Sequence, residues 1–124
     1  MLSIAVAVMC VAVGIGLWLG AQILIIEVPS AHTRKVAIVH GVVAVGCVVL
    51  TYVALARPGP PVSAFGWGAW YILAATLAGG LTILTFNLLR RTPATPLIAV
   101  HAMAGLAGAV MLAAYFSTKG SFGR

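Results

Sequence analysis

Charged residues are scarce in this sequence. Of its 124 residues, 6% are charged and 63% are hydrophobic, and the only acidic residue is Glu27. Soluble globular domains carry about 25% charged residues, so this composition excludes an ordinary soluble domain. It predicts instead a chain whose greater part lies within a membrane.

The sequence also lacks the side-chain groupings on which most catalytic sites depend. One acid and three histidines cannot supply a Ser-His-Asp set or paired carboxylates, so hydrolytic catalysis is not expected. Cys10 and Cys47 lie in different apolar runs without a C-x-x-C spacing, which argues against a redox pair or a zinc site. The basic residues stand at the ends of apolar runs, where such residues face lipid headgroups. Nucleic-acid binding is therefore not expected either.

Four apolar stretches are long enough to cross a bilayer, which takes about 20 residues per helix. The predicted spans are about 2–26, 36–56, 65–89 and 97–116. The breaks "EVPSAHTRK", "RPGPPVS" and "RRTPATP" are short, so neighbouring helices must run antiparallel. We therefore predict a single all-α transmembrane domain, an up-down-up-down four-helix bundle that covers residues 1–124.

Basic and aromatic residues divide unequally between the two ends of this bundle. One end receives Arg34, Lys35, Arg90 and Arg91, and the other receives Arg57, Lys119 and Arg124. The aromatic residues near the second end are Tyr52, Phe65, Trp67, Trp70, Tyr71, Tyr115 and Phe116. The positive-inside tendency then makes the first end cytoplasmic. We expect an integral protein of the bacterial inner membrane with both termini outside the cytoplasm.

Two of the four spans carry a histidine near their start. His40, in "IVHGVVAVG", and His101, in "AVHAMAGLAG", are 61 residues apart, which indicates either a duplicated helical hairpin or a chance alignment of apolar helices. Both spans enter from the same end, so they are parallel and their histidines lie at one depth. Positions i, i+4 and i+7 share a helix face. Small residues follow the histidines on that face: Ala44 on one span, and Gly105 and Gly108 on the other.

Two level imidazoles above small residues would suit a b-type haem. His40 and His101 would be the axial ligands of the haem iron, and the small residues would let the porphyrin approach the helices. The residues expected to pair with the propionates at the membrane surface are Arg34, Lys35 and Arg91. A structural histidine pair, the magnesium of a chlorophyll-type pigment, a metal ion and proton handling remain open as alternatives.

The pattern of these two spans resembles that of small four-helix membrane cytochromes b with bis-histidine ligation. The resemblance implies a haem-b electron-transfer protein or the haem-bearing subunit of a larger respiratory or redox complex. Those families often carry four ligating histidines for two haems, whereas no histidine stands near Tyr52 and Tyr115 at the second end. Because one haem cannot carry electrons across about 30 Å of hydrocarbon, partner subunits are expected to continue the path.

Two further hypotheses come from other classes of protein. A cofactor-free accessory subunit would fill lipid-facing gaps in a membrane complex, and the sequence shows no extramembrane domain. A small proton-coupled transporter would use Glu27 as its coupling carboxylate, although Glu27 stands at the end of its span. If Glu27 has no such role, we expect it to pair with Arg34, Lys35 or Arg91. His32 is expected in a loop, and Asn87 is expected to hydrogen-bond between helices.

Overall fold

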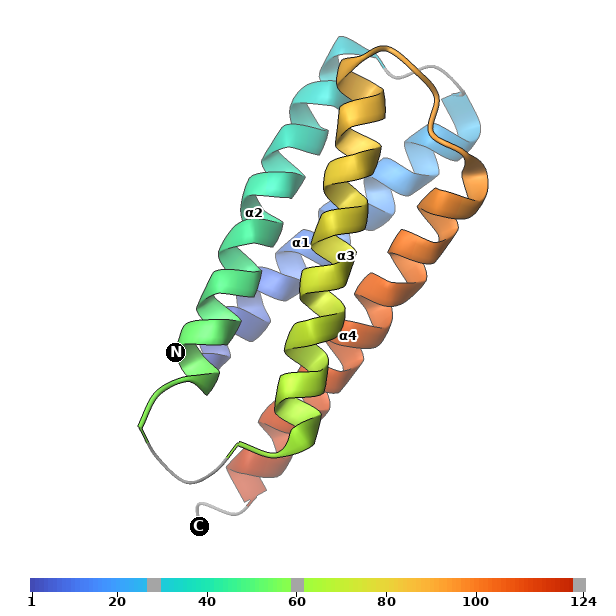
Figure 1. Cartoon of the computed structure of the whole chain (residues 1–124). Helices are drawn as coiled ribbons and strands as arrows, with labels where there is room; N and C mark the ends of the chain where they lie inside the picture. Colours follow the sequence, from blue (N-terminus) through green and yellow to red (C-terminus); the bar gives the residue numbers. More distant parts are fainter. Residues whose placement is uncertain (27–29, 59–61, 122–124) are drawn as a thin grey trace.

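The computed structural model describes residues 1–26, 30–58 and 62–121. The helices are α1 (Leu2–Ile26), α2 (Ala31–Leu55), α3 (Ala64–Leu88) and α4 (Thr95–Ser121), and the described residues form no strand. They run alternately up and down, so α2 and α4 both begin at the end where α1 and α3 finish (Figure 1). Each is long and apolar enough to cross a membrane. The predicted all-α transmembrane four-helix bundle is confirmed.

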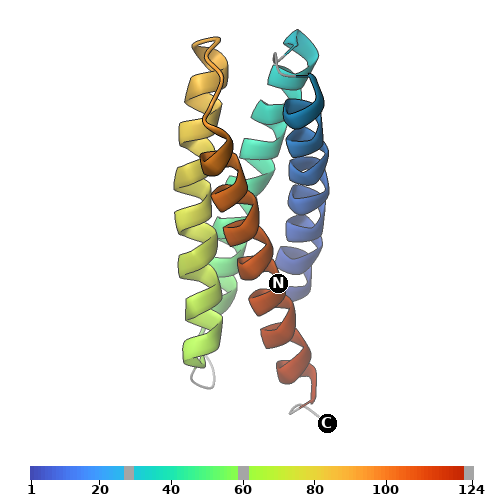
Figure 2. The ribbon, with the colours of Figure 1, turned by 90° about the vertical axis from the view of Figure 1, so that its right-hand side faces the viewer.

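The helices form a closed ring around a common axis. α1 packs against α2 and α4, and α3 packs against α2 and α4, whereas the backbones of the diagonal pairs stay apart within the described residues. Figure 2 shows the two hairpins, α1 with α2 and α3 with α4, side by side with α4 running obliquely. As predicted, α2 and α4 are parallel. Because they are diagonal neighbours, side chains on their inner faces meet at the bundle axis.

α2 begins five residues before the predicted start of its span. Ser30 caps it: the Ser30 hydroxyl accepts a hydrogen bond from the Thr33 backbone N–H at 3.0 Å and lies 2.8 Å from the Thr33 hydroxyl. A serine in this position satisfies one of the free donors of a first helical turn. The cap carries the helix through His32, Arg34 and Lys35, so the expectation that His32 is a loop residue is wrong.

α4 is longer than its predicted span at both ends. At its C-terminal end the hydroxyls of Ser117 and Thr118 donate to the carbonyls of Ala113 and Tyr115, at 3.0 and 2.9 Å. Such local bonds satisfy polar side chains within the helix itself. The polar residues that were expected to end the span at 116 therefore continue the helix.

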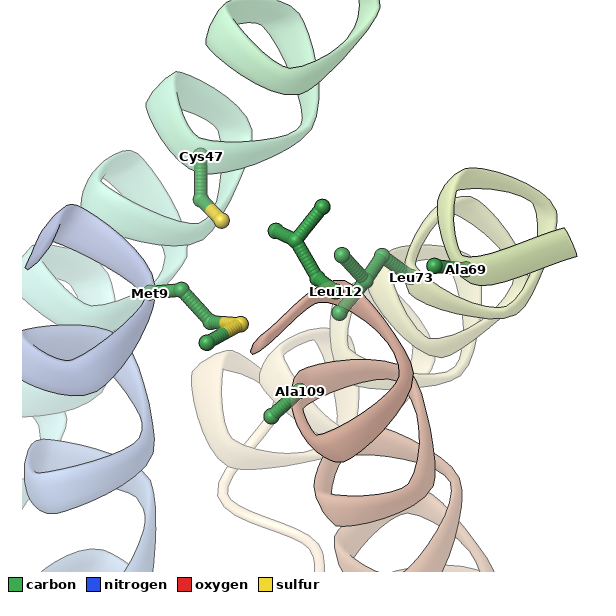
Figure 3. Packing of buried hydrophobic residues seen from close by; sticks show 6 residues of the cluster. All are labelled: Met9, Cys47, Ala69, Leu73, Ala109 and Leu112. Atoms are coloured by element: carbon green, nitrogen blue, oxygen red, sulfur yellow. The ribbon is translucent and has the colours of Figure 1, made fainter. Parts of the chain in front are cut away.

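The core lies towards the end of the bundle where α2 finishes and α3 begins. Its six side chains come from all four helices (Figure 3). They are Met9, Cys47, Ala69, Leu73, Ala109 and Leu112. Leu112 is fully buried, and so is the nearby Thr51, whose hydroxyl donates to the Cys47 carbonyl at 2.8 Å. Close packing of this kind holds membrane helices together, because apolar side chains gain little by leaving lipid. This cluster closes one end of the bundle axis.

The two ends of the bundle differ in chemistry. We call the end with Arg34, Lys35, Arg90 and Arg91 the basic end, and the other the aromatic end. At the aromatic end, rings of α2 and α3 lie 5.2–6.2 Å apart, and the Trp70 indole donates to the Val48 carbonyl at 3.1 Å. Tyr and Trp are typical of membrane interfaces. The aromatic grouping was predicted; which end is cytoplasmic stays a prediction.

Candidate functional site

The two span histidines meet at the bundle axis. The ring centroids of His40 on α2 and His101 on α4 are 6.4 Å apart, and the ring planes are inclined by 85°. The two helices are parallel and start at the same end, which places the rings at the same depth. The structure thus brings together, from opposite corners of the bundle, the pair that the sequence singles out.

Each imidazole lies over a glycine of the preceding helix. A Cβ atom built on Gly16 of α1 would lie 2.9 Å from Cε1 of His40, and one on Gly80 of α3 would lie 2.8 Å from Cε1 of His101. Real Cβ atoms essentially never come so close to another heavy atom. Only glycine therefore leaves room for each ring between the helices. Neither glycine was identified from the sequence as the support of a histidine ring, although the two stand 64 residues apart, close to the spacing of the histidines.

Backbone carbonyls orient the rings. Nδ1 of His101 lies 3.0 Å from the carbonyl oxygen of Thr76, one turn before Gly80. Because a carbonyl only accepts, Nδ1 must carry the proton, which leaves the lone pair on Nε2 free for a ligand. On α1 the counterpart of Thr76 is Ala12, whose carbonyl faces His40. That contact falls short of a hydrogen bond, and Nδ1 of His40 is buried without a partner among the described residues.

A cavity of about 160 Å³ lies against the two imidazoles and touches all four helices. Its wall is apolar and rich in small residues: Gly16 and Gly20 of α1; Ala37, Gly41 and Ala44 of α2; Gly80 of α3; Ala102 and Gly105 of α4. Met9 and Leu73 belong to both this wall and the core cluster, so the core closes the cavity towards the aromatic end. The cavity is therefore a space between the helices, with both histidines of the pair in its wall.

The cavity wall contains two polar atoms that lack partners. Nδ1 of His40 and Oδ1 of Asn87 are buried without a hydrogen bond, and no other side-chain nitrogen or oxygen in the described part of the chain shares this condition. Both residues line the cavity. Buried polar groups in native proteins are nearly always hydrogen-bonded. The expected hydrogen bond of the Asn87 carbonyl oxygen to another helix is not made, and the two atoms are available to a group bound in the cavity.

The other predicted site residues divide into two groups. Ala44 and Gly105 line the cavity. Gly108 faces α3 instead, because a Cβ atom there would lie 2.8 Å from Cδ2 of Leu73. Gly108 therefore serves helix packing beside the cavity rather than the cavity itself.

The predicted cationic partners lie outside the cavity wall. Arg34 is half-buried and Lys35 is exposed in the first turns of α2, at the basic end. Arg91 lines a second groove with Leu81, Thr82, Thr85 and Phe86 of α3 and with Leu89, which directly follows α3. Glu27 lies outside the described residues, and so does its expected pairing with one of these cations. Across the described ranges, no group of three or more His, Cys, Asp or Glu side chains could hold a metal ion.

The histidine, the glycine beneath it and the facing carbonyl recur in both hairpins. The spacing is 61 residues for the histidines and 64 for both the glycines and the carbonyls of Ala12 and Thr76. This three-part correspondence favours a duplicated hairpin over a chance alignment of apolar helices. Comparison of the chain with family models, with curated proteins and with solved structures gave no match.

Proposed function

We propose that the protein is a membrane-embedded haem-b protein in which His40 and His101 are the axial ligands of one iron. It would transfer electrons, either alone or as the haem-bearing subunit of a larger redox complex. The observation that carries this proposal is the 6.4 Å separation of the two ring centroids, which come from opposite corners of the bundle. A first-row metal binds an imidazole nitrogen at about 2 Å, so two rings on opposite sides of one ion have centroids about 6 Å apart.

The donor set also supports a metal that arrives with most of its own ligands. Two imidazoles leave a bare ion without enough protein ligands, since no third metal-binding side chain joins them in the described chain. A porphyrin supplies four nitrogens in one plane and leaves two axial positions for the protein. When bound, haem b supplies a one-electron carrier.

The chain's own residues have definite tasks in this proposal. The Thr76 carbonyl fixes the tautomer and orientation of His101, and such partners make the coordinating nitrogen more basic. The apolar wall keeps water from the site, and burial of this kind is one means by which a protein sets a haem potential. His32, the remaining histidine, lies against Trp18 at a ring distance of 6.1 Å, so it belongs to another part of the bundle. One haem is therefore proposed, with partner subunits continuing the electron path.

The test is a reduced-minus-oxidised absorption spectrum of the purified protein. We expect the sharp α-band of a six-coordinate b-type haem, and its loss in both His40→Ala and His101→Ala. His32→Ala is the matched control and should keep the band, because His32 lies outside the cavity wall. A colourless wild-type protein that stays colourless after incubation with hemin would contradict the proposal and favour a cofactor-free accessory subunit. A pigment spectrum of another type would assign the histidines to magnesium.

A further inference from the structure

The groove that ends at Arg91 lies on the exposed side of α3, and we call it the α3 groove. It has a volume of about 470 Å³, which is in the range of ligand-binding pockets. Its lining residues recur at the spacing of one helix face: Leu81, Thr82, Thr85, Phe86, Leu89 and Arg91. Leu81 stands about two turns before the end of α3, and Arg91 stands beyond that end. In a membrane the α3 groove therefore runs from the hydrocarbon region up to the surface.

The free polar groups of the α3 groove are gathered at its surface end. The hydroxyls of Thr82 and Thr85 donate to carbonyls one turn earlier in their own helix, at 3.1 and 2.9 Å, so these donors are already used. Arg91 is exposed and brings a guanidinium group with five donors. The only acid of the chain, Glu27, lies outside the described residues, so no carboxylate of the described chain pairs with Arg91. An occupant of this groove must be apolar in its deeper part and anionic at the surface.

The turn that places Arg91 has an arginine where glycine is usual. The backbone N–H of Arg91 donates to the Phe86 carbonyl at 2.9 Å, and that of Arg90 donates to the Asn87 carbonyl at 3.2 Å. These two bonds form a Schellman cap, in which Arg90 holds the left-handed position with a φ of 55°. Arg90 is the only non-glycine residue with a positive φ in the part of the chain that the structure describes.

A side chain strains the left-handed conformation, and glycine does not. Residues held in such a conformation are concentrated at functional sites. The charge of Arg90 gives a reason for keeping an arginine at this position, because it adds to the charge of Arg91 at the same level of the membrane. The same cap brings the chain back over the last turn of α3, so that Arg91 and Phe86 line the groove together.

We propose that the α3 groove binds an anionic phospholipid. The guanidinium group of Arg91 holds the phosphate through two parallel hydrogen bonds, and Arg90 supplies a second positive charge. One acyl chain lies along α3 towards Leu81. A soluble anion would leave the apolar part of the groove empty, and a zwitterionic lipid brings its own cation to a site that already has two. This inference does not depend on haem, since the α3 groove lies outside the histidine cavity.

The experiment is native mass spectrometry of the purified chain in a neutral detergent, titrated with phosphatidylglycerol or with phosphatidylcholine of the same acyl chains. We expect one phosphatidylglycerol to bind about tenfold more tightly than phosphatidylcholine, and Arg91→Gln to remove this preference. Arg90→Gly should weaken phosphatidylglycerol binding about threefold. Lys35→Gln is the matched control, because Lys35 is an exposed cation of the same end that does not line the groove, and it should leave the affinity unchanged. The bonds of the cap are made by the backbone, so the Arg91 variant keeps the turn.

A second measurement separates lipid binding from a structural role of Arg90. Glycine takes up the left-handed conformation without strain, so Arg90→Gly should raise the midpoint of SDS unfolding while it weakens phosphatidylglycerol binding. A merely structural residue would move both in the same direction.

Three outcomes would overturn the lipid site. The first is an equal loss of binding in Lys35→Gln and Arg91→Gln, since the lipid would then follow only the total charge. The second is equal binding of the two lipids by the wild-type protein. The third is displacement of phosphatidylglycerol by inorganic phosphate, which would make the groove a site for a free anion. A wild-type protein that prefers phosphatidylglycerol but takes up no haem contradicts the proposed function alone.

Discussion

The α1–α2 and α3–α4 hairpins hold their histidines in nearly the same way, and they differ in one contact of a ring nitrogen. In each, the ring lies over a glycine, Gly16 or Gly80, at a distance that leaves no room for a Cβ atom. In the second hairpin the ring nitrogen of His101 also reaches the Thr76 carbonyl, whereas in the first the corresponding nitrogen of His40 has no partner within the described chain. Each ring is thus positioned over a glycine, and a separate contact fixes the tautomer of His101 only.

The difference between the hairpins has a local cause in the sequence. The Thr76 hydroxyl donates to the Ile72 carbonyl at 2.8 Å, and such bonds to the preceding turn tend to bend a helix. Ala12, its counterpart on α1, has no hydroxyl. The carbonyl that reaches His101 therefore belongs to a residue with such a bond, and the carbonyl that faces His40 belongs to a residue without one.

The largest effect is expected from adding a methyl group beneath the rings. Gly16→Ala and Gly80→Ala each force an imidazole to move, which should cost about 1–3 kcal/mol of unfolding free energy and loosen the bound group. The controls are Gly14→Ala, where nothing lies within 4 Å, and Gly79→Ala, where the nearest atom is Nδ1 of His101 at 3.8 Å.

Both controls should be more stable than the wild type by up to about 1 kcal/mol, because alanine favours helix. Unfolding in mixed micelles with increasing SDS measures all four variants. Equal stability of the Gly79 and Gly80 variants would show that the ring is free to move aside, and the comparison between the hairpins would lose its basis.

The next effect concerns the two histidines, whose replacement by leucine should change the free energy of unfolding in opposite directions. In the haem-free protein, His40→Leu removes a buried nitrogen without a partner, whose cost is about 1–3 kcal/mol, whereas His101→Leu removes a made hydrogen bond. We therefore expect His40→Leu to be the more stable variant by about 2 kcal/mol. The same SDS titration checks it, with His32→Leu as the control outside the cavity. The reverse order would mean that His40 is the better satisfied of the two.

The helices and the histidine pair could be predicted from the sequence, whereas the glycines and the carbonyl that support the rings could not. The four spans follow from hydropathy, and short connections make α2 and α4 parallel, which puts His40 and His101 at one depth. The start of α2 was placed too late, because a serine cap outweighs the polar character of the next five residues. Hydropathy, the length of a connection and a helix cap are local properties, so a sequence expresses them directly.

Features that depend on how two helices cross were missed or misplaced. Gly16 and Gly80 support the rings from other helices, so no spacing along α2 or α4 indicates them. Gly108 shares a helix face with His101, and both lie against α3, but Gly108 packs on Leu73 and does not line the cavity. Asn87 was expected to hydrogen-bond to another helix, but its carbonyl oxygen is buried without a partner among the described residues. All of these depend on how neighbouring helices pack, which the pattern of a single helix does not express.

The smallest effect is expected from removing the Thr76 hydroxyl, which tests why the carbonyl contacts of His101 and His40 differ. Thr76→Ala makes α3 resemble α1, so the His101 contact should lengthen towards that of His40, at a cost of about 0.5 kcal/mol. The ¹⁵N shift of Nδ1 of His101 should then move towards the value of His40. Thr82→Ala is the matched control, since its hydroxyl makes the same kind of bond, to the Ala78 carbonyl at 3.1 Å, on the exposed side of α3. If the His101 shift does not move in Thr76→Ala, the threonine does not aim the carbonyl, and the hairpins differ instead through the wider packing of α3 on α4.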